Sequence, residues 1–476
     1  MFYCLLKDVI FRKYNDFGYI TDNSMFGYHF LDEESSLPGE KFFSESGAIM
    51  INELSYTPQN IDDIVNSLLT IFEGVEFNEL KNDTIEFYTN FVSDGFLACG
   101  ETFEECSDYK RKKVIKAECA TNIFGTVSFQ NKKLDNLIKS LHIEIVNECN
   151  ERCVHCYIPH YLKNKILDSD LFYDIIEQGR KLNIINVTIS GGEPLLHKDF
   201  LGFLKKCREL NLSVNILSNL TLLDDEIIEE MKRNPLLSVQ TSIYSMHPEV
   251  HDNITKKAGS LVKTLESVCK LISKGIPVQI SCPIMKQNKT DFMEVVKWGK
   301  SKNISVLTDY VIFAAYDHSN SNLVNRLSLD EVEHAFKMQL SEAYAKEIKD
   351  KASKKENLSE NEPVCSICRY FFCISAEGNV FPCVGWQSKI IGNVRNQKIK
   401  DLWEKSEEVN KLRNVKRKQF PKCLVCKNRG YCTICMMSNS NESKEGDIFK
   451  IEKYHCDVAS LIHKNTDIYL SKKNSF

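Results

Sequence analysis

From residue 141 to about residue 315, short apolar runs alternate with amphipathic stretches. Six runs are typical of buried parallel strands: HIEIVN (142–147), NVTIS (186–190), SVNILSN (213–219), LLSVQTSIY (236–244), PVQISCPI (277–284) and SVLTDYVIF (305–313). Stretches with helical spacing lie between them, such as DSDLFYDIIEQGRKL (168–182) and GSLVKTLESVCKLISKG (259–275). This alternation predicts an α/β fold, a partial (β/α)6 barrel of the TIM type, with its chemistry at the carboxyl ends of the strands.

The rest of the chain must form further domains, because 476 residues exceed one ordinary core. No run of eighteen apolar residues occurs, and the N-terminal sequence MFYCLLKDVIFRKY lacks the features of a signal peptide. We therefore expect a cytoplasmic protein with no membrane partner. The 19 cysteines should then remain thiols, so clustered cysteines indicate metal sites.

Three cysteines, Cys149, Cys153 and Cys156, follow directly on the first barrel strand in the sequence CNERCVHCY. Thiolates select iron–sulfur clusters or zinc. On a four-iron cluster, three thiolates leave one iron open to a small molecule. A zinc site would instead need a fourth ligand, from His155, His160 or a distant residue. The spacing alone leaves both alternatives open.

The second barrel strand ends in the sequence SGGEP, residues 190–194. Gly191 and Gly192 allow backbone to approach a ligand closely, and Glu193 can receive an ammonium group. CxxxCxxC after one strand and GGEP after the next resemble the radical S-adenosylmethionine (SAM) superfamily. The resemblance implies that the three cysteines form the catalytic [4Fe–4S] site. It also implies that SAM binds the open iron and contacts Gly191 to Pro194, and that SAM cleavage gives a 5′-deoxyadenosyl radical that abstracts hydrogen.

The next two strands supply further candidate SAM contacts. The third ends at Ser218 and Asn219, and the fourth at Ser242 and Tyr244. These positions are similar to those of the ribose and carboxylate contacts in the superfamily. The stretch HPEVHDNITKKAGS (247–260) also resembles the peptide-modifying members, although its two histidines, His247 and His251, could equally be surface residues.

A second cysteine array begins at residue 365. Its members are Cys365, Cys368, Cys373, Cys383, Cys423, Cys426, Cys432, Cys435 and Cys456, with a hairpin expected at Gly378. In isolation, the CxxC pairs could form a zinc knuckle. The array resembles the SPASM domain, which carries two auxiliary [4Fe–4S] clusters. The resemblance rests on Cys-x9-Gly-x4-Cys from Cys368 to Cys383 and on the GNV…LW stretch at 392–403.

The SPASM resemblance implies two sets of cluster ligands. The inner set is Cys365, Cys368, Cys383 and Cys435, and the outer set is Cys423, Cys426, Cys432 and Cys456. Cys435 departs from the usual spacing, because two residues separate it from Cys432 where the family has three. Cys373 is either a substitute ligand or a buried thiol. Buried thiols are also expected at the cysteines without ligand spacing: Cys4, Cys99, Cys106, Cys119, Cys207, Cys269 and Cys282.

Residues 1–105 predict a winged helix-turn-helix domain. Its expected elements are strands within FYCLLKDVIF (2–11), FGYITDNS (17–24) and YHFLDEE (28–34), helices at 46–54, 61–72 and 84–93, and a returning strand at 96–100. This segment holds 5 Lys and Arg against 20 Asp and Glu, a charge that opposes binding to nucleic acid. In its order of elements it resembles the element by which maturases of ribosomally made peptides bind a leader. Such elements add the peptide as a strand to a sheet edge.

We thus expect a winged-helix element (1–105), a linker (106–140), a radical SAM barrel (141–315), a helical linker (316–364), a SPASM domain (365–460) and a tail (461–476). The resemblances together imply an oxidoreductase that cross-links a precursor peptide, with a thioether at cysteine as the expected product. Its cofactors would be three [4Fe–4S] clusters and SAM, and its electron donor a flavodoxin or ferredoxin. The alternatives are carbon–carbon cross-linking, another peptide or protein oxidation of the sulfatase-maturase kind, and an iron–sulfur-sensing DNA-binding regulator.

Overall fold

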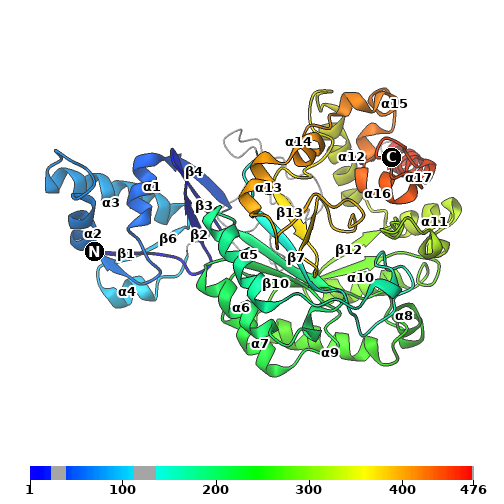
Figure 1. Ribbon diagram of the computed structural model, residues 1–476, viewed down its shortest axis with the longest axis horizontal. Coiled ribbons are helices and arrows are strands. Elements are labelled where there is room, and N and C mark those ends of the chain that lie inside the picture. The colour runs from blue at the N-terminus through cyan, green and yellow to red at the C-terminus, as the bar shows by residue number, and fades with distance from the viewer. Residues whose placement is uncertain (23–38, 112–135, 474–476) are drawn as a thin grey trace.

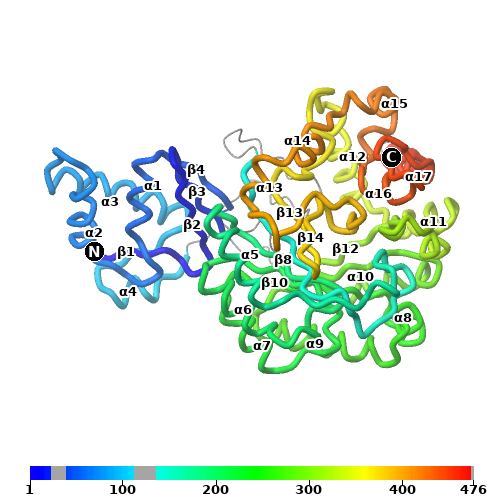
Figure 2. Tube along the Cα trace, viewed as in Figure 1, coloured from blue at the N-terminus to red at the C-terminus, as the bar shows by residue number. Residues whose placement is uncertain are grey.

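The computed structural model describes residues 1–22, 39–111 and 136–473. An N-terminal module, an α/β barrel and a C-terminal cysteine-rich region follow one another along the chain (Figure 1). The N-terminal module and the last helix, α17 (Lys453–Lys473), lie at opposite ends of the molecule (Figure 2). Of the helices in the described ranges, none is both long and apolar enough to cross a membrane.

The N-terminal module contains two three-stranded sheets, in the orders β5-β1-β6 and β2-β3-β4. The strands are β1 (Phe2–Leu5), β2 (Ile10–Lys13), β3 (Phe17–Thr21), β4 (Glu40–Ser44), β5 (Gln59–Asn60) and β6 (Leu97–Gly100). The helices are α1 (Glu45–Asn52), α2 (Ile61–Leu68), α3 (Phe77–Ser93) and α4 (Phe103–Ser107). The order of strands, three helices and a returning strand is the predicted one.

Local sequence signals explain most of these elements. The Asn60 side chain accepts a hydrogen bond from the Asp62 amide at 2.9 Å and caps α2, as expected. Helix α3 begins seven residues before the expected start at Thr84, because Leu80 extends the buried stripe of this helix by one turn. The segment 2–11 forms two strands in different sheets instead of one. The strand expected at 28–34 lies outside the described residues.

The barrel strands form a parallel sheet in the order β12-β11-β10-β9-β8-β7, as the strand–helix alternation predicts. They are β7 (Ser140–Val146), β8 (Asn186–Gly191), β9 (Ser213–Leu217), β10 (Leu237–Ser242), β11 (Val278–Pro283) and β12 (Ser305–Asp309). The helices between them are α5 (Ser169–Lys181), α6 (Phe200–Glu209), α7 (Asp225–Lys232), α8 (Pro248–Thr255), α9 (Ser260–Ser273) and α10 (Phe292–Ser301). Since β7 and β12 do not pair, the barrel is partial.

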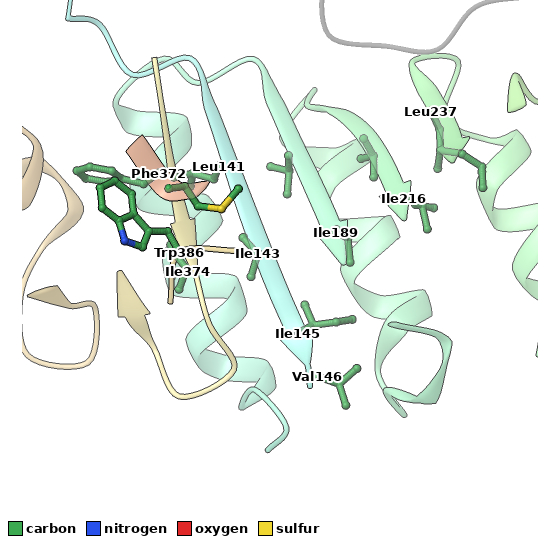
Figure 3. Packing of buried hydrophobic residues seen from close by; sticks show 14 of the residues in the cluster. Leu141, Ile143, Ile145, Val146, Ile189, Ile216, Leu237, Phe372, Ile374 and Trp386 are labelled. Atoms are coloured by element: carbon green, nitrogen blue, oxygen red, sulfur yellow. The ribbon is translucent and has the colours of Figure 1, made fainter. Parts of the chain in front are cut away.

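The cysteine-rich region continues the barrel sheet. Strand β13 (Phe371–Ile374) pairs in parallel with the free edge of β7, and β14 (Asn379–Phe381) and β15 (Gly392–Asn393) follow antiparallel. Figure 3 shows the shared apolar core, in which Ile143 of β7 lies near Ile374 and Trp386 of the C-terminal region. The two regions are therefore joined by backbone pairing as well as by side-chain packing.

Helices surround the cysteine-rich region. They are α11 (Leu329–Gln339), α12 (Glu342–Glu356), α13 (Ile399–Lys405), α14 (Glu407–Arg413), α15 (Pro421–Leu424), α16 (Met436–Glu442) and α17. Helices α11 and α12 fall in the predicted helical linker. No tail begins at residue 461, because α17 runs through that position to residue 473.

The N-terminal module docks on the amino edge of the barrel sheet. The buried Arg12 side chain donates from Nε to the Ile184 carbonyl at 3.0 Å and from Nη2 to the Asn211 carbonyl at 2.7 Å. These two residues lie two positions before the starts of β8 and β9. Beside them, Ile10, Phe17 and Tyr19 of the module pack on Ile185. The module is thus fixed to the edge opposite the loops that carry Cys149 and Gly192.

Candidate functional site

The loop after β7 places Cys149, Cys153 and Cys156 together at the carboxyl edge, all half-buried. The Arg152 amide donates to the Thr255 carbonyl at 2.8 Å, and the Val154 amide donates to the Ile254 carbonyl at 3.0 Å. These bonds hold the loop against the end of α8. The expected catalytic cysteines therefore lie where the strand order predicted them.

Several neighbours interact with these thiols. Lys163 Nζ lies 3.4 Å from Cys156 Sγ, and the Glu151 amide donates to Cys149 Sγ at 3.4 Å. Burial raises the pKa of Cys149 to about 11. Metal binding to such thiols would release their protons, because the thiolate is the ligand.

The GGEP loop packs directly on the backbone that leads into the cysteine loop. The Gly192 amide donates to the Val146 carbonyl at 2.7 Å, and the Glu193 amide donates to the Glu148 carbonyl at 2.9 Å. A Cβ atom would lie 1.8 Å from the Val146 oxygen at Gly191 and 2.1 Å from the Glu148 oxygen at Gly192. The two glycines are therefore required by close backbone contact.

The Glu193 carboxyl is fully buried and joins two strand ends. It accepts hydrogen bonds from Ser218 Oγ at 2.7 Å, from the Asn219 amide at 2.7 Å and from the Leu195 amide at 3.0 Å. Burial raises its pKa to about 7, against the lowering effect of these bonds. A carboxylate can accept about four hydrogen bonds. Three donors thus leave room for about one more, such as one N–H of an ammonium group.

The candidates after β9 face the same place. Ser218 Oγ both donates to Glu193 and accepts from the Leu220 amide at 2.9 Å, so its hydroxyl is engaged within the chain. The Asn219 side chain donates to Asn150 Oδ1 at 2.8 Å and lies 4.0 Å from Cys149 Sγ. The structure thus brings Asn219 into contact with the cysteine loop, while Ser218 orients Glu193. Pro194 is buried and begins a short helical turn.

The candidates after β10 lie on the other side of the cysteine loop. The Tyr244 hydroxyl is 3.4 Å from His155 Nε2, and Ser242 contacts this tyrosine. His251 is buried, and its Nδ1 accepts from the Tyr244 amide at 3.3 Å. His247 and His160 are exposed. His251 therefore supports Tyr244, and His247 is a surface residue.

The inner cysteine set comes together from three distant segments. The thiols of Cys365, Cys368, Cys383 and Cys435 lie close enough to raise one another's pKa, in addition to the larger effect of burial. Cys435 caps α16 and accepts from the Ser438 amide at 3.4 Å. Its unusual spacing does not remove it from this set.

The outer set lines a cavity of about 290 Å³, which Cys435 also borders. The four thiols are those of Cys423, Cys426, Cys432 and Cys456. Lys355 and His455 share the lining, and Cys456 is exposed. These four thiols are the ones that the SPASM resemblance assigns to the outer set, and the assignment of each set to a cluster stays a prediction.

The remaining cysteines are mostly buried thiols, as expected. Cys373 is fully buried in β13 near Cys383 and Cys368. Cys4, Cys106, Cys207 and Cys282 are also buried, whereas Cys99 is half-buried. The prediction of a buried thiol is wrong for Cys269, which is exposed on the solvent side of α9. Cys119 lies outside the described residues.

Sequence reasoning missed some of the neighbours of the candidate site. Lys163 and Asn150 contact the cysteine loop and its partners. Glu144 lies inside the barrel on β7 and is buried. The sequence contained a signal for Glu144, since a carboxylate interrupts the apolar run HIEIVN. The loop contacts had no such signal, because they depend on how a non-repetitive segment folds.

The donor sets fit iron–sulfur clusters, because each consists of soft sulfur ligands. One set has three thiols, near the buried carboxyl of Glu193, and two sets have four. Across residues 1–22, 39–111 and 136–473, no three His, Cys, Asp or Glu side chains are positioned to bind a single metal ion.

Comparisons with known proteins divide the chain in the same way. Residues 143–299 match the radical SAM superfamily, and residues 365–436 match SPASM, an iron–sulfur cluster-binding domain. The AdoMet-dependent heme synthase of Methanosarcina barkeri is 25% identical over 61% of this chain and 89% of its own length. The PqqA peptide cyclase of Gluconobacter oxydans is 22% identical over 68% of this chain and 94% of its own.

Two solved structures share the fold. Streptococcus suis SuiB bound to precursor peptide SuiA has a TM-score of 0.59 and 13% identity, and the match covers 95% of this chain and 99% of SuiB. The structure of anSMEcpe with bound AdoMet has a TM-score of 0.55 and 16% identity, and the match covers 71% of this chain and 96% of that one. The match to SuiB thus extends over the part of the chain that the match to anSMEcpe leaves out.

Proposed function

We propose that this chain, which carries a radical SAM domain and a SPASM domain, cross-links a ribosomally made precursor peptide. The radical SAM superfamily uses SAM and a [4Fe–4S] cluster, and the SPASM domain binds auxiliary clusters. The product that we propose is a thioether between a cysteine sulfur of the peptide and a carbon of another residue.

We assign the cofactors to the three thiol sets. Cys149, Cys153 and Cys156 hold the cluster to which SAM binds, and the inner and outer sets of the C-terminal region hold one auxiliary cluster each. SAM lies between the GGEP loop, Asn219 and Tyr244, with Glu193 receiving its ammonium group. When bound, SAM and its cluster supply the radical that removes a hydrogen atom from the peptide. A flavodoxin or ferredoxin supplies the electron.

The N-terminal module is the main support for the proposal that the substrate is a peptide. It occupies about the first fifth of the chain and contributes none of the proposed cluster ligands. The buried Arg12 fixes it to the barrel, so it is a permanent part of the enzyme. SuiB, whose fold match includes this region, was solved with a precursor peptide, and the PqqA cyclases are named for a peptide substrate.

Strand β4 offers an edge to which a leader can add as a strand. One side of β4 pairs with β3, and no strand in the described part of the chain pairs with its other side. At the opposite edge of this sheet, the Lys13 carbonyl of β2 already accepts from Asn183 at 2.9 Å. The 20 acidic and 5 basic residues of the segment 1–105 favour a basic leader and oppose DNA.

Ring closure through carbon atoms is the second candidate, because the similarity to the PqqA peptide cyclases covers 94% of their length. The two candidates differ in the fate of the cysteine thiol. A thioether consumes the thiol, whereas a carbon–carbon link leaves it free.

Mass spectrometry of the modified peptide tests the proposal. The probe is the synthetic peptide encoded by a short cysteine-containing reading frame beside the gene, incubated anaerobically with reconstituted enzyme, SAM and dithionite. We expect a product that has lost two hydrogen atoms per link and has one fewer thiol open to iodoacetamide.

The control is the Cys149→Ala enzyme, which should give no product. A product that has lost hydrogen but keeps all its thiols would replace the thioether by the carbon–carbon alternative. Unmodified peptide in the presence of active SAM cleavage would contradict the proposed function.

A further inference from the structure

Strand β7 carries a carboxyl group into the inside of the barrel. Leu141, Ile143 and Ile145 of this strand belong to the apolar core shown in Figure 3. Since side chains alternate along a strand, His142 and Glu144 face the opposite way. The His142 ring bonds Ser190 Oγ of β8 at 2.5 Å, so it has a partner.

Only one of the two carboxyl oxygens of Glu144 has a hydrogen-bond partner in the described part of the chain. Its side chain is 1% exposed, and its Oε2 accepts a hydrogen bond from Gln387 Nε2. Its Oε1 has no hydrogen-bond partner within residues 1–22, 39–111 and 136–473. A buried carboxyl oxygen without a donor costs free energy, so a carboxyl with a purely structural role would have both oxygens engaged.

The position of Glu144 is between two thiol sets. Tyr157, which directly follows Cys156, lies close enough for Glu144 to raise its pKa. Gln387 lies four residues beyond Cys383 of the inner set. The segment between them is held in place, because the Trp386 amide donates to the Cys383 carbonyl at 3.0 Å. Glu144 thus lies inside the barrel between Tyr157, which adjoins the cysteine loop, and Gln387, which adjoins the inner set.

The groups around Glu144 are anionic or neutral, and within the described ranges of the chain no ion pair joins it to a cation. Burial raises its pKa to about 8, the Gln387 hydrogen bond lowers it, and Glu377 in the turn after β13 raises it further. Glu144 in turn raises the pKa of Tyr316 and of Cys373 in β13. Burial lowers the pKa of His142, on the same strand, to about 4, so that ring is neutral at pH 7.

We propose that Glu144 is the base that accepts the proton lost by the peptide when its cross-link forms. This inference rests on the proposed function. The acceptor carbon has already lost a hydrogen atom to the SAM-derived radical, and it forms a bond to the donor sulfur, whose S–H bond breaks. The proton goes to Oε1 of Glu144, and the remaining electron goes to an auxiliary iron–sulfur cluster. Each bond, proton and electron is thereby accounted for.

The first test compares Glu144→Gln with wild-type enzyme, using the peptide of the preceding subsection. The readout is the amount of cross-linked peptide per 5′-deoxyadenosine at saturating peptide, where this ratio reports on the steps after SAM cleavage. We expect the ratio to fall at least about tenfold, because general bases contribute about a hundredfold or more. Glu377→Gln is the matched control, and its ratio should stay within about twofold of wild type.

The pH profile separates a base from a structural group. In wild-type enzyme the ratio should rise with pH through about 8, because only the ionised carboxylate accepts a proton. Glu144→Asp should keep a rising profile, and Glu144→Gln should lose it. Glu377→Gln removes a neighbouring negative charge and should move the midpoint to lower pH.

Iron content and SAM binding, measured on each variant, establish that it is folded and loaded. A Glu144→Gln enzyme with the wild-type ratio and the wild-type pH profile would overturn the role of Glu144. Failure of the wild-type enzyme to cross-link the peptide would instead contradict the proposed function.

Discussion

At the amino edge of the barrel sheet, the buried guanidinium of Arg12 gives its hydrogen bonds to backbone carbonyls at Phe11, Ile184 and Asn211. At the carboxyl edge, the buried carboxyl of Glu193 receives three hydrogen bonds and keeps room for about one more. Burial lowers the pKa of Arg12 to about 9 and raises that of Glu193 to about 7, so both ions are costly. At the amino edge, the hydrogen bonds of the buried ion hold the N-terminal module against the barrel. At the carboxyl edge, the buried ion keeps one hydrogen-bonding position for a ligand.

The largest loss of activity is expected from a substitution at the close backbone contact between the GGEP loop and the cysteine loop. Gly192→Ala would place Cβ 2.1 Å from the Glu148 carbonyl oxygen, so the GGEP loop must move away from the cysteine loop. We expect SAM cleavage to fall by roughly a hundredfold or more, about 3 kcal/mol in the barrier. Chromatography of 5′-deoxyadenosine measures it.

Gly202→Ala is the matched control. Its Cβ would meet only the hydroxyl end of the Tyr173 side chain at 2.7 Å, and that side chain can turn away. Equal SAM cleavage by the two variants would show that the close approach at Gly192 is unimportant.

The joint at the amino edge is tested by Arg12→Met. The variant leaves the Ile184 and Asn211 carbonyls without their donor, and we expect the free energy of unfolding to fall by about 3 kcal/mol. Limited proteolysis should then cut between the module and the barrel, while SAM cleavage by the intact fraction continues. Urea unfolding and gel analysis of the digest measure the two effects.

Lys13→Met provides the comparison, because Lys13 is the exposed neighbour on the same strand. It should behave like wild type. An Arg12 variant as stable and as protease-resistant as Lys13→Met would contradict the claim that Arg12 holds the module on the barrel.

Glu193→Gln should weaken SAM binding by about tenfold to a hundredfold, roughly 1.5–3 kcal/mol. The amide keeps the size of the side chain but loses the charge that attracts an ammonium group. Cluster content should remain that of wild type. Equilibrium binding of SAM to reconstituted enzyme gives the affinity. Glu148→Gln, an exposed carboxyl of the same loop, is the control, and equal affinities in both variants would remove Glu193 from the SAM site.

The smallest effect concerns the α8–α9 corner that supports the cysteine loop. Burial raises the pKa of Asp252, but hydrogen bonds from the Leu261 and Gly259 amides and the Ser260 hydroxyl outweigh it and leave the pKa lowered. The corner is therefore stabilised above the unfolded pKa, and the stabilisation is lost as pH falls through the folded value. We expect Asp252→Asn to cost about 1 kcal/mol at pH 7.

Urea unfolding measures this cost, which should vanish as pH falls through the lowered pKa of Asp252, because the wild-type carboxyl is then also protonated. Asp225→Asn, at an exposed carboxylate paired with Lys270, should leave the stability close to that of wild type. A cost that stays constant with pH would contradict the role of the charge.

The sequence predicted those features of the two edges that depend on local sequence patterns. Strand periodicity placed the cysteine loop and Glu193 at one edge, and the SPASM resemblance implied two sets of C-terminal thiols. It did not predict that Arg12 meets Ile184 or that β13 pairs with β7. Such contacts join segments that are about 170 or more residues apart and depend on long-range packing. Cys269 was assigned to the interior because it lacks ligand spacing, although its position on α9 faces solvent.

The central claim is that the two edges have separate functions. The module docked on the amino edge binds the leader, and the carboxyl edge carries out the chemistry. This claim is tested most directly by kcat/KM of the full-length enzyme for the precursor peptide with and without its leader. We predict that removing the leader lowers kcat/KM for the peptide at least about a hundredfold, about 3 kcal/mol. Equal kcat/KM for the two peptides would contradict the claim.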